Sequence, residues 1–306
     1  MTASVHVRAP GKINIALRVG AREADGYHRL ATVFQAVSLY EDVVARDGDD
    51  IQVSVTGRQA DQVPTGPENL AYRAARLLAE ATGTQRGVQL QIHKQVPTAG
   101  GMGGGSADAA ATLLACDLLW QTGLAREELG ELAAELGADV PFALTGQTAV
   151  GVGRGDVLTP ALARGRYTWV LAISHRGLAT PQVFSEWDQQ NPGPVPEPTI
   201  DPRLMQALLS ADPWRLAPLM VNELQPAAVA ARPELDQVMG AFLRSPAIAT
   251  TISGSGPTVI GLAADAVDAN EIVSQLTAAA VADEVLMVHG PAPGARLVAS
   301  VMGEAD

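Results

Sequence analysis

The chain has 306 residues, of which 47% are hydrophobic and 18% charged, and its formal net charge is −12. This length suffices for two compact domains, and the low charge content argues against a disordered chain. The acidic balance disfavours nucleic acid or an anionic membrane as a partner, because either would require a basic face.

The first part of the chain predicts β-strands. Hydrophobic residues alternate with polar ones or form apolar runs in four segments: 5–7, 13–19, 32–44 and 51–55. The alternation of the second segment extends back to residue 12, so the side chains of Lys12 and Asn14 point to the same face of the strand. Residues 24–28, with the sequence Ala-Asp-Gly-Tyr-His, predict a turn between strands.

A helix, a strand and a second helix follow in the next part of the chain. Asn69 is a favourable N-cap and Gly83 a favourable stop, so the residues between them predict a helix. Residues 87–93 alternate as a half-buried strand does. Residues 106–120 are rich in Ala and Leu and contain neither Gly nor Pro, which predicts a helix.

A glycine-dense segment, residues 97–107, lies between that strand and the second helix, with five glycines in the six positions from Gly100 to Gly105. Glycine lets a backbone approach a ligand closely, and free N–H groups at a helix N-terminus attract anions. We therefore predict a phosphate-binding loop rather than a plain surface turn. It is neither a P-loop, since no Gly-Lys-Ser/Thr ends it, nor a Rossmann fingerprint, since Ser106 replaces the third glycine.

The rest of the chain mixes both kinds of element. The predicted helices are 125–136, 207–219, 222–226, 234–243 and 268–280. The predicted strands are 148–155, 168–174, 258–263 and 284–288. Residues 191–202, rich in proline, and 250–257, rich in small residues, predict loops. The fold class is therefore α+β or α/β in two layers, and we expect two domains, 1–159 and 160–306.

Several polar residues are compatible with an ordinary structural role. Asp139 follows the helix stop Gly137, so it is either the N-cap of a short helix or a functional carboxylate. His93 and Lys94 are predicted to be surface residues. Asp108 is predicted to lie in the first turn of its helix, where a negative charge is favourable.

The single cysteine, Cys116, cannot form an internal disulfide and is expected to be a small buried hydrophobic residue. No apolar run approaches the length of a membrane span, and the first residues lack the regions of a signal peptide. We expect a cytoplasmic protein that does not bind a membrane and is a monomer or a weak homodimer.

Three segments in this order resemble the GHMP kinase superfamily of small-molecule kinases: 9–14 (Ala-Pro-Gly-Lys-Ile-Asn), 97–107 and 253–257 (Ser-Gly-Ser-Gly-Pro). A finer resemblance, to one family of these kinases, rests on three more: 25–28 (Asp-Gly-Tyr-His), 136–141 (Leu-Gly-Ala-Asp-Val-Pro) and 180–184 (Thr-Pro-Gln-Val-Phe). The resemblance covers nearly the whole chain. It implies two domains with the active site in the cleft between them.

The activity implied by the finer resemblance is phosphorylation, by ATP with Mg²⁺, of the 2-hydroxyl of 4-(cytidine 5′-diphospho)-2-C-methyl-D-erythritol. This is a step of non-mevalonate isoprenoid synthesis. The resemblance also implies that Asp139 is the base and Lys12 its electrostatic partner. The ATP loop would consist of Pro97, Thr98, Ala99, Gly100, Gly101, Met102, Gly103, Gly104, Gly105, Ser106 and Ala107. Met102 replaces the usual leucine and Ala107 a common serine, so no metal contact is assigned to position 107.

For the second substrate, the resemblance implies that Tyr27 and Phe184 enclose the cytosine ring and that His28 hydrogen-bonds its polar edge. Asn14, Thr180 and Asp139 would contact the substrate's hydroxyls or phosphates. No spacing of histidines suits a structural metal, so Mg²⁺ is expected only with ATP.

Two alternatives remain at this point. A homoserine or mevalonate type of GHMP kinase would keep Lys12, the glycine-dense loop and Asp139, but would have no reason for the aromatic residues. A non-catalytic nucleotide-binding protein on the same fold would be expected to lose the base or the loop glycines, and the sequence retains both.

Overall fold

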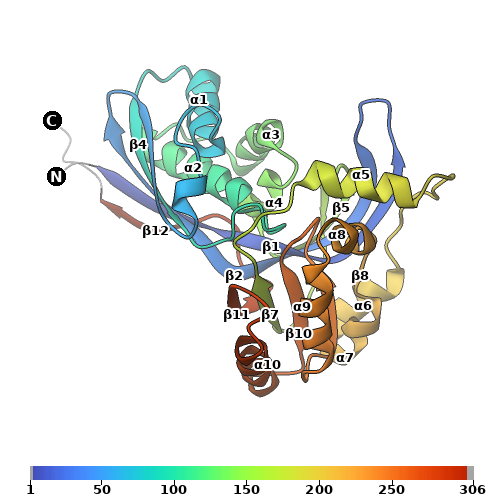
Figure 1. Ribbon diagram of the computed structural model, residues 1–306. Helices are drawn as coiled ribbons and strands as arrows, with labels where there is room; N and C mark the ends of the chain where they lie inside the picture. Colours follow the sequence, from blue (N-terminus) through green and yellow to red (C-terminus); the bar gives the residue numbers. More distant parts are fainter. Residues whose placement is uncertain (1–2, 302–306) are drawn as a thin grey trace.

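A computed structural model describes residues 3–301, which form two lobes (Figure 1). The larger sheet has eight strands: β1 (Ser4–Arg22), β2 (His28–Gly48), β3 (Ile51–Gly57), β4 (Gly87–Lys94), β5 (Thr148–Gly153), β6 (Val157–Pro160), β8 (Val221–Asn222) and β12 (Arg296–Val301). Its main order is β12-β1-β2-β4-β3, with β5 beside β2, β6 beside β5, and β8 beside β1.

The smaller sheet has four antiparallel strands in the order β11-β7-β10-β9. Their bounds are β7 (Tyr167–Ile173), β9 (Ala249–Ile252), β10 (Val259–Ala263) and β11 (Glu284–Gly290). The long strands β1 and β2 pair along most of their length and contribute to the cores of both lobes.

Four helices belong to the first lobe: α1 (Leu70–Thr82), α2 (Gly104–Trp120), α3 (Arg126–Leu136) and α4 (Val140–Thr145). Helix α2 contacts both β1 and β2 as well as the other three helices, so it is the centre of this lobe. Its Ala-rich sequence permits this close packing, because small side chains let neighbouring backbones approach on every side. The core includes Val7, Leu90, Leu78 and Leu113.

Six helices belong to the second lobe: α5 (Thr180–Gln190), α6 (Pro202–Ser210), α7 (Pro213–Leu216), α8 (Gln225–Ala231), α9 (Glu234–Leu243) and α10 (Ala266–Ala278). Two 3₁₀ turns are η1 (Ala60–Gln62) and η2 (Ala217–Leu219). A separate core lies where the two sheets meet, with Ile13 and Ile15 against Trp169 and Leu171. The lobes therefore share buried apolar surface.

Local signals located several elements well. Asn69 caps α1 by accepting from the Ala71 N–H, and Gly83 ends that helix in a left-handed conformation (φ 70°). Residues 9–11 do not break β1 but only shift its register against β2. Cys116 is fully buried, as expected.

Other elements differ from the predictions. The expected helix at 207–219 is divided into α6 and α7, because Pro213 starts a new helix after a break. In place of the helix expected at 222–226, the structure has α8, which begins at Gln225. Helix α5 and strand β12 were not predicted, and β12 returns the chain to the first sheet. Among residues 3–301, no helix is both long and apolar enough to cross a membrane.

Candidate active site

Lys12 occupies the centre of the cleft and is almost fully buried on β1. Its Nζ donates to Asn14 Oδ1 at 2.9 Å and to the Gly101 carbonyl at 3.0 Å, and it lies 3.6 Å from Asp139 Oδ2. Asn14 in turn donates to Thr32 Oγ1 at 2.8 Å. A buried ammonium requires such partners, because an unpaired buried charge is strongly destabilising. The predicted pair of Lys12 and Asp139 thus comes together.

Asp139 stands at the N-cap position of α4, but its side chain forms no capping hydrogen bond there. The carboxylate faces Lys12 instead and remains 31% exposed. A Cβ added at Gly103 would lie 3.6 Å from Asp139 Oδ2. The carboxylate is therefore adjacent to the glycine-dense loop and accessible from solvent, as a group that acts on a bound substrate must be.

The glycine-dense loop leads directly into the N-terminus of α2, which begins at Gly104, two residues earlier than predicted. Gly101 and Gly103 have positive φ values of 76° and 70°. A Cβ on Gly101 would lie only 2.1 Å from the Ser253 carbonyl oxygen, so only glycine fits there. The free N–H groups of the first turn of α2 can receive an anion.

The third predicted segment, residues 253–257, packs against the loop and Lys12. Ser253 Oγ donates to the Gly101 carbonyl at 3.0 Å, and a Cβ at Gly254 would lie 3.3 Å from Lys12 Nζ. Ser255 Oγ lies 2.8 Å from Thr180 Oγ1 at the start of α5. This segment thus connects the loop to the helix that carries the predicted substrate residues.

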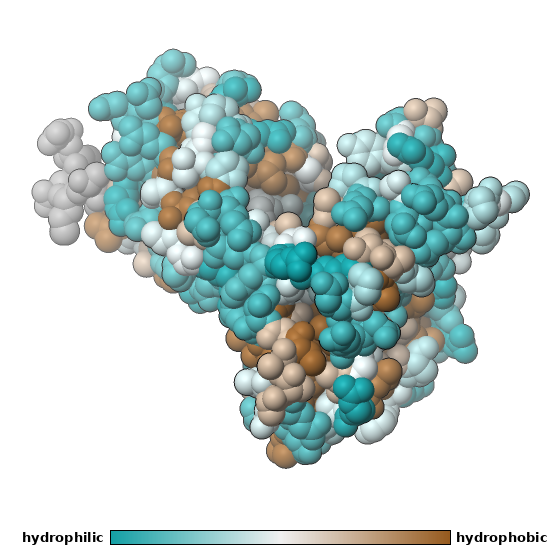
Figure 2. All heavy atoms as spheres, viewed as in Figure 1, coloured by the Kyte–Doolittle hydropathy of each residue, from teal (hydrophilic) through white to brown (hydrophobic). Residues whose placement is uncertain are grey.

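Two cavities meet at Asp139. A cavity of about 360 Å³ is lined by Lys12, Asn14 and the loop, and one of about 730 Å³ is lined by Tyr27, His28 and α5. The residues that line both are Leu30, Ser106, Asp139, Arg154, Thr180 and Phe184. In Figure 2 the surface is hollowed between the lobe with α1 to α3 and the part that carries α5.

The larger cavity has an aromatic end. Phe184 stacks on the His28 ring with centroids 4.9 Å apart, and Trp187 meets that ring edge-on at 5.3 Å. Tyr27 is 57% exposed at the tip of the β1–β2 hairpin. Thr180 and Phe184 both lie on α5, a helix that was not predicted. Pro181 at the start of that helix was the available signal.

Two charged residues of this cavity were missed. Asp188 Oδ1 lies 2.7 Å from His28 Nε2 and so fixes the imidazole. The Arg154 guanidinium lies over the Tyr27 ring, 5.0 Å from its centroid. Asp188 is four residues after Phe184 on a helix, so a correct prediction of α5 would have placed both on one face. No sequence signal indicated Arg154.

The prediction of Lys94 as a surface residue is wrong, while His93 is exposed as expected. Lys94 is 3% exposed, and its Nζ lies 2.6 Å from Asp108 Oδ2 and 2.5 Å from Glu41 Oε1. Asp108 is the fifth residue of α2 and lies beyond its first turn. We refer to Glu41, Lys94 and Asp108 as the buried triad. A Cβ at Gly104 would contact it within 3.3 Å, so the triad lies directly beneath the loop.

The triad has two carboxyl groups for one lysine. Burial, together with the charge of Asp108, raises the pKa of Glu41 to about 8. Burial also raises the pKa of Asp108, although Lys94 acts in the opposite direction. Burial by itself would lower the pKa of Lys94, but the charges of Asp108 and Glu41 outweigh it and raise that pKa. Near neutral pH one proton is therefore retained by the two carboxyl groups.

A magnesium ion carried by ATP is compatible with these residues. Within residues 3–301, no cluster of three or more His, Cys, Asp or Glu side chains could enclose a metal. Mg²⁺ in nucleotide enzymes is held chiefly by phosphates and water with one or two protein ligands. The Ser106 hydroxyl, which lines both cavities, is suitably placed to be one of them.

Comparison with known families agrees with this geometry. The model of the GHMP kinases N terminal domain matches residues 69–147, and that of the GHMP kinases C terminal domain matches residues 204–282. A crystal structure of a homoserine kinase from Cytophaga hutchinsonii covers 96% of the chain with a TM-score of 0.72. At 19% identity it shows a shared fold only.

More similar proteins define the family within this class. A 4-diphosphocytidyl-2-C-methyl-D-erythritol kinase from Clavibacter michiganensis is 51% identical over 302 residues, which is 96% of each chain. One from Thermobifida fusca is 47% identical over 96% of this chain and 98% of its own. A crystal structure of a 4-(cytidine 5′-diphospho)-2C-methyl-D-erythritol kinase, 33% identical, covers 93% of this chain and 98% of its own with a TM-score of 0.76. The chain belongs to the GHMP kinases, and within them to the 4-diphosphocytidyl-2-C-methyl-D-erythritol kinase family.

The buried triad predicts a pH-dependent stability. Because the pKa of Glu41 is higher in the folded state than its ordinary value of 4.5, folding retains a proton that the unfolded chain releases. The resulting stabilisation is present below pH 4.5 and is lost as the pH rises towards about 8. Asp108→Asn removes a charge that raises this pKa, so its free energy of unfolding should fall less steeply from pH 5 to 8 than that of the unmodified protein.

Urea unfolding at several pH values would measure both slopes. Asp268→Asn, which removes a partly exposed carboxylate at the start of α10, is the control and should follow the unmodified protein. Parallel profiles for Asp108→Asn and the unmodified protein would contradict the retained proton.

The loop geometry predicts a strong effect of one methyl group. Gly101→Ala places a Cβ against the Ser253 carbonyl, and the positive φ at this position is unfavourable for alanine. The variant should therefore displace the loop and abolish detectable binding of an ATP analogue. Gly130→Ala, on α3 with no atom within 4 Å of the added Cβ, is the control and should add roughly 0.5–1 kcal/mol of stability. Titration calorimetry gives the result, and normal affinity in Gly101→Ala would exclude this loop as the nucleotide site.

Proposed function

We propose that the chain transfers the γ-phosphoryl group of ATP to the 2-hydroxyl of 4-(cytidine 5′-diphospho)-2-C-methyl-D-erythritol, giving ADP and the 2-phosphate. The observation that carries this proposal is the position of Asp139, which lines both cavities and faces Lys12. The smaller cavity has a helix N-terminus for phosphates, and the larger has aromatic rings for a base. The reacting groups would meet where the cavities join.

The reaction follows from this arrangement. The acceptor oxygen forms a bond to the γ-phosphorus, the bond from that phosphorus to the bridging oxygen of ADP breaks, and the hydroxyl proton passes to Asp139. Lys12 stabilises the negative charge of the carboxylate and of the acceptor oxygen as the proton leaves. Since the transition state of phosphoryl transfer is loose, a carboxylate of modest basicity suffices.

The loop from Pro97 to Ala107 would hold the triphosphate through backbone N–H groups. Mg²⁺, arriving with ATP, neutralises phosphate charge, and Ser106 would be its protein contact. Because the first turn of α2 supplies fixed dipoles, little reorganisation is needed as charge moves to the leaving group.

The cytidine moiety would occupy the larger cavity. One face of Phe184 is covered by His28, so a base would stack on the other face, with Tyr27 opposite. Asp188 holds the His28 ring through Nε2. The remaining polar atoms of His28 would hydrogen-bond the polar edge of cytosine. Asn14, Thr180 and Arg154 would contact hydroxyls and phosphates, because all three line the space beside Asp139.

Several further predictions from the sequence stay predictions. These are the division into domains at 159/160, the cytoplasmic location, and the monomeric or weakly dimeric state. The alternative of a homoserine or mevalonate type of kinase would be tested by offering the purified protein each acceptor with ATP. The proposal requires that the cytidine substrate be strongly preferred.

The role of Asp139 as base can be tested by Asp139→Asn. This variant keeps the shape of the side chain but cannot accept the proton, so turnover should fall by at least about a hundredfold while the KM for both substrates stays near normal. Glu131→Gln, an exposed neutralisation on α3, is the control and should be fully active. A coupled assay of ADP release measures both. Unchanged turnover in Asp139→Asn would exclude it as the base.

The stacking role of Tyr27 can be tested by Tyr27→Ala. Loss of one aromatic face removes about 1–3 kcal/mol of stacking, so the KM for the cytidine substrate should rise roughly 5- to 150-fold while the KM for ATP is nearly constant. Tyr27→Phe retains the ring and should restore the KM. Equal effects of Tyr27→Ala on both KM values would reject this role.

A further inference from the structure

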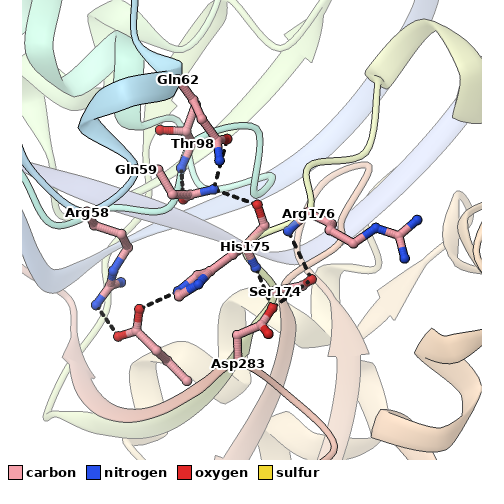
Figure 3. A network of polar contacts seen from close by, with 9 residues as sticks. Arg58, Gln59, Gln62, Thr98, Ser174, His175, Arg176 and Asp283 are labelled. Atoms are coloured by element: carbon pink, nitrogen blue, oxygen red, sulfur yellow. Dashed lines mark hydrogen bonds and ion pairs between the residues drawn. The ribbon is translucent and has the colours of Figure 1, made fainter.

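A polar network outside both cavities joins the two lobes (Figure 3). Its centre is Gln59, which lies between β3 and η1. The side-chain Oε1 of Gln59 accepts from the Thr98 N–H at 2.9 Å, and its Nε2 donates to the His175 carbonyl at 2.8 Å. Thr98 belongs to the glycine-dense loop, and His175 belongs to the segment between β7 and α5. One amide group thus spans the boundary between these two segments.

Ion pairs support the same junction. The Glu284 carboxylate forms ion pairs with the Arg58 guanidinium at 2.5 Å and with His175 Nε2 at 2.6 Å. The Arg58 N–H donates to the Lys94 carbonyl at 2.9 Å, which fixes this residue to the end of β4. On the other side, the His175 N–H donates to Asp283 Oδ2 at 2.7 Å. We refer to Arg58, Gln59, His175 and Glu284 as the clasp.

The backbone at Gln59 indicates that its side chain has a specific task. The residue adopts a left-handed conformation, with φ 50° and ψ 31°. For a residue with a Cβ this conformation costs about 1 kcal/mol, and glycine or asparagine would adopt it more readily. The length of the side chain explains why glutamine stands here. Its amide accepts from Thr98 and donates to His175 at once, and a shorter side chain would not reach both partners.

The segment that the clasp holds leads directly to substrate residues. The Leu178 N–H donates to the Ala99 carbonyl at 3.4 Å, and a Cβ at Gly177 would lie 2.7 Å from the Ala99 Cβ. Two residues after Leu178, helix α5 begins with Thr180, and Phe184 follows one turn later. A displacement of the loop therefore moves the start of α5, and the reverse also holds.

We propose that the clasp couples the ATP loop to helix α5, so that ATP and the cytidine substrate each strengthen the binding of the other, with Gln59 as the positioning residue. This inference rests on the proposed kinase function. It differs from a purely structural role in one measurable way: the clasp should affect the interaction between two ligands, and not only the stability of the fold.

The test measures the dissociation constant of a non-hydrolysable ATP analogue with and without the saturating cytidine substrate. In the unmodified protein the substrate should tighten analogue binding by about fivefold or more. Gln59→Ala should weaken the analogue alone by roughly fivefold, the worth of one hydrogen bond, and should reduce the coupling factor towards one. Gln59→Glu keeps the acceptor for Thr98 but loses the donor to His175, so it should bind the analogue normally and still lose coupling.

Gln62→Ala is the matched control, because Gln62 is exposed and its side chain contacts Gln59 at 3.3 Å; it should keep the full coupling. If the unmodified protein shows coupling and Gln59→Ala retains it, the proposed role of the clasp is wrong. Absence of coupling in the unmodified protein, with both ligands bound, would also overturn it while leaving the kinase function intact. Failure of the unmodified protein to bind either ligand would instead contradict the proposed function.

Discussion

A single peptide group, the carbonyl of Gly101, holds the candidate site together. It accepts hydrogen bonds from Lys12 Nζ and from Ser253 Oγ, both at 3.0 Å. These donors come from β1 and from the turn before β10, so segments far apart in the sequence are fixed against one loop. The approach is close enough that any side chain at position 101 would collide with the Ser253 carbonyl. The placement of the Lys12 ammonium, the glycine-dense loop and the second lobe therefore depends on one glycine.

Much of the fold and the centre of the site could be predicted, because the relevant signals are local. The alternation in β1 places Lys12 and Asn14 on one face, and their side chains are indeed hydrogen-bonded to each other. Asn69 and the glycine-dense loop mark the beginnings of α1 and α2 for reasons of backbone chemistry. The pairing of Lys12 with Asp139 was expected from a family resemblance. Spacing alone did not decide whether Asp139 is a helix N-cap or a functional carboxylate.

What could not be predicted depends on contacts between distant segments. Lys94 follows an alternating strand near a loop, which is typical of a surface lysine, and its burial requires Glu41 and Asp108 from other elements. Similarly, the strained conformation of Gln59 has no local signature, since its partners lie in two other segments. Helix α5 was missed for a different reason: it is short and contains mixed residues, so its apolar stripe, with Val183 and Trp187 buried, is weak.

The chain contains only two lysines, and both lie against the glycine-dense loop. Lys12 is placed between the loop and Asp139, and Lys94 lies beneath Gly104, where α2 begins. Every other basic residue except histidine is arginine. An ammonium group is compact and directs three donors tetrahedrally, whereas a guanidinium is planar and wide. Beneath this closely packed loop, a compact cation satisfies two buried carboxyl groups without displacing the glycines. If the loop holds a triphosphate as proposed, its positive surroundings in this acidic protein come from Lys12 and the N–H groups of α2 rather than from a basic surface, because the charge of Lys94 is balanced within the buried triad.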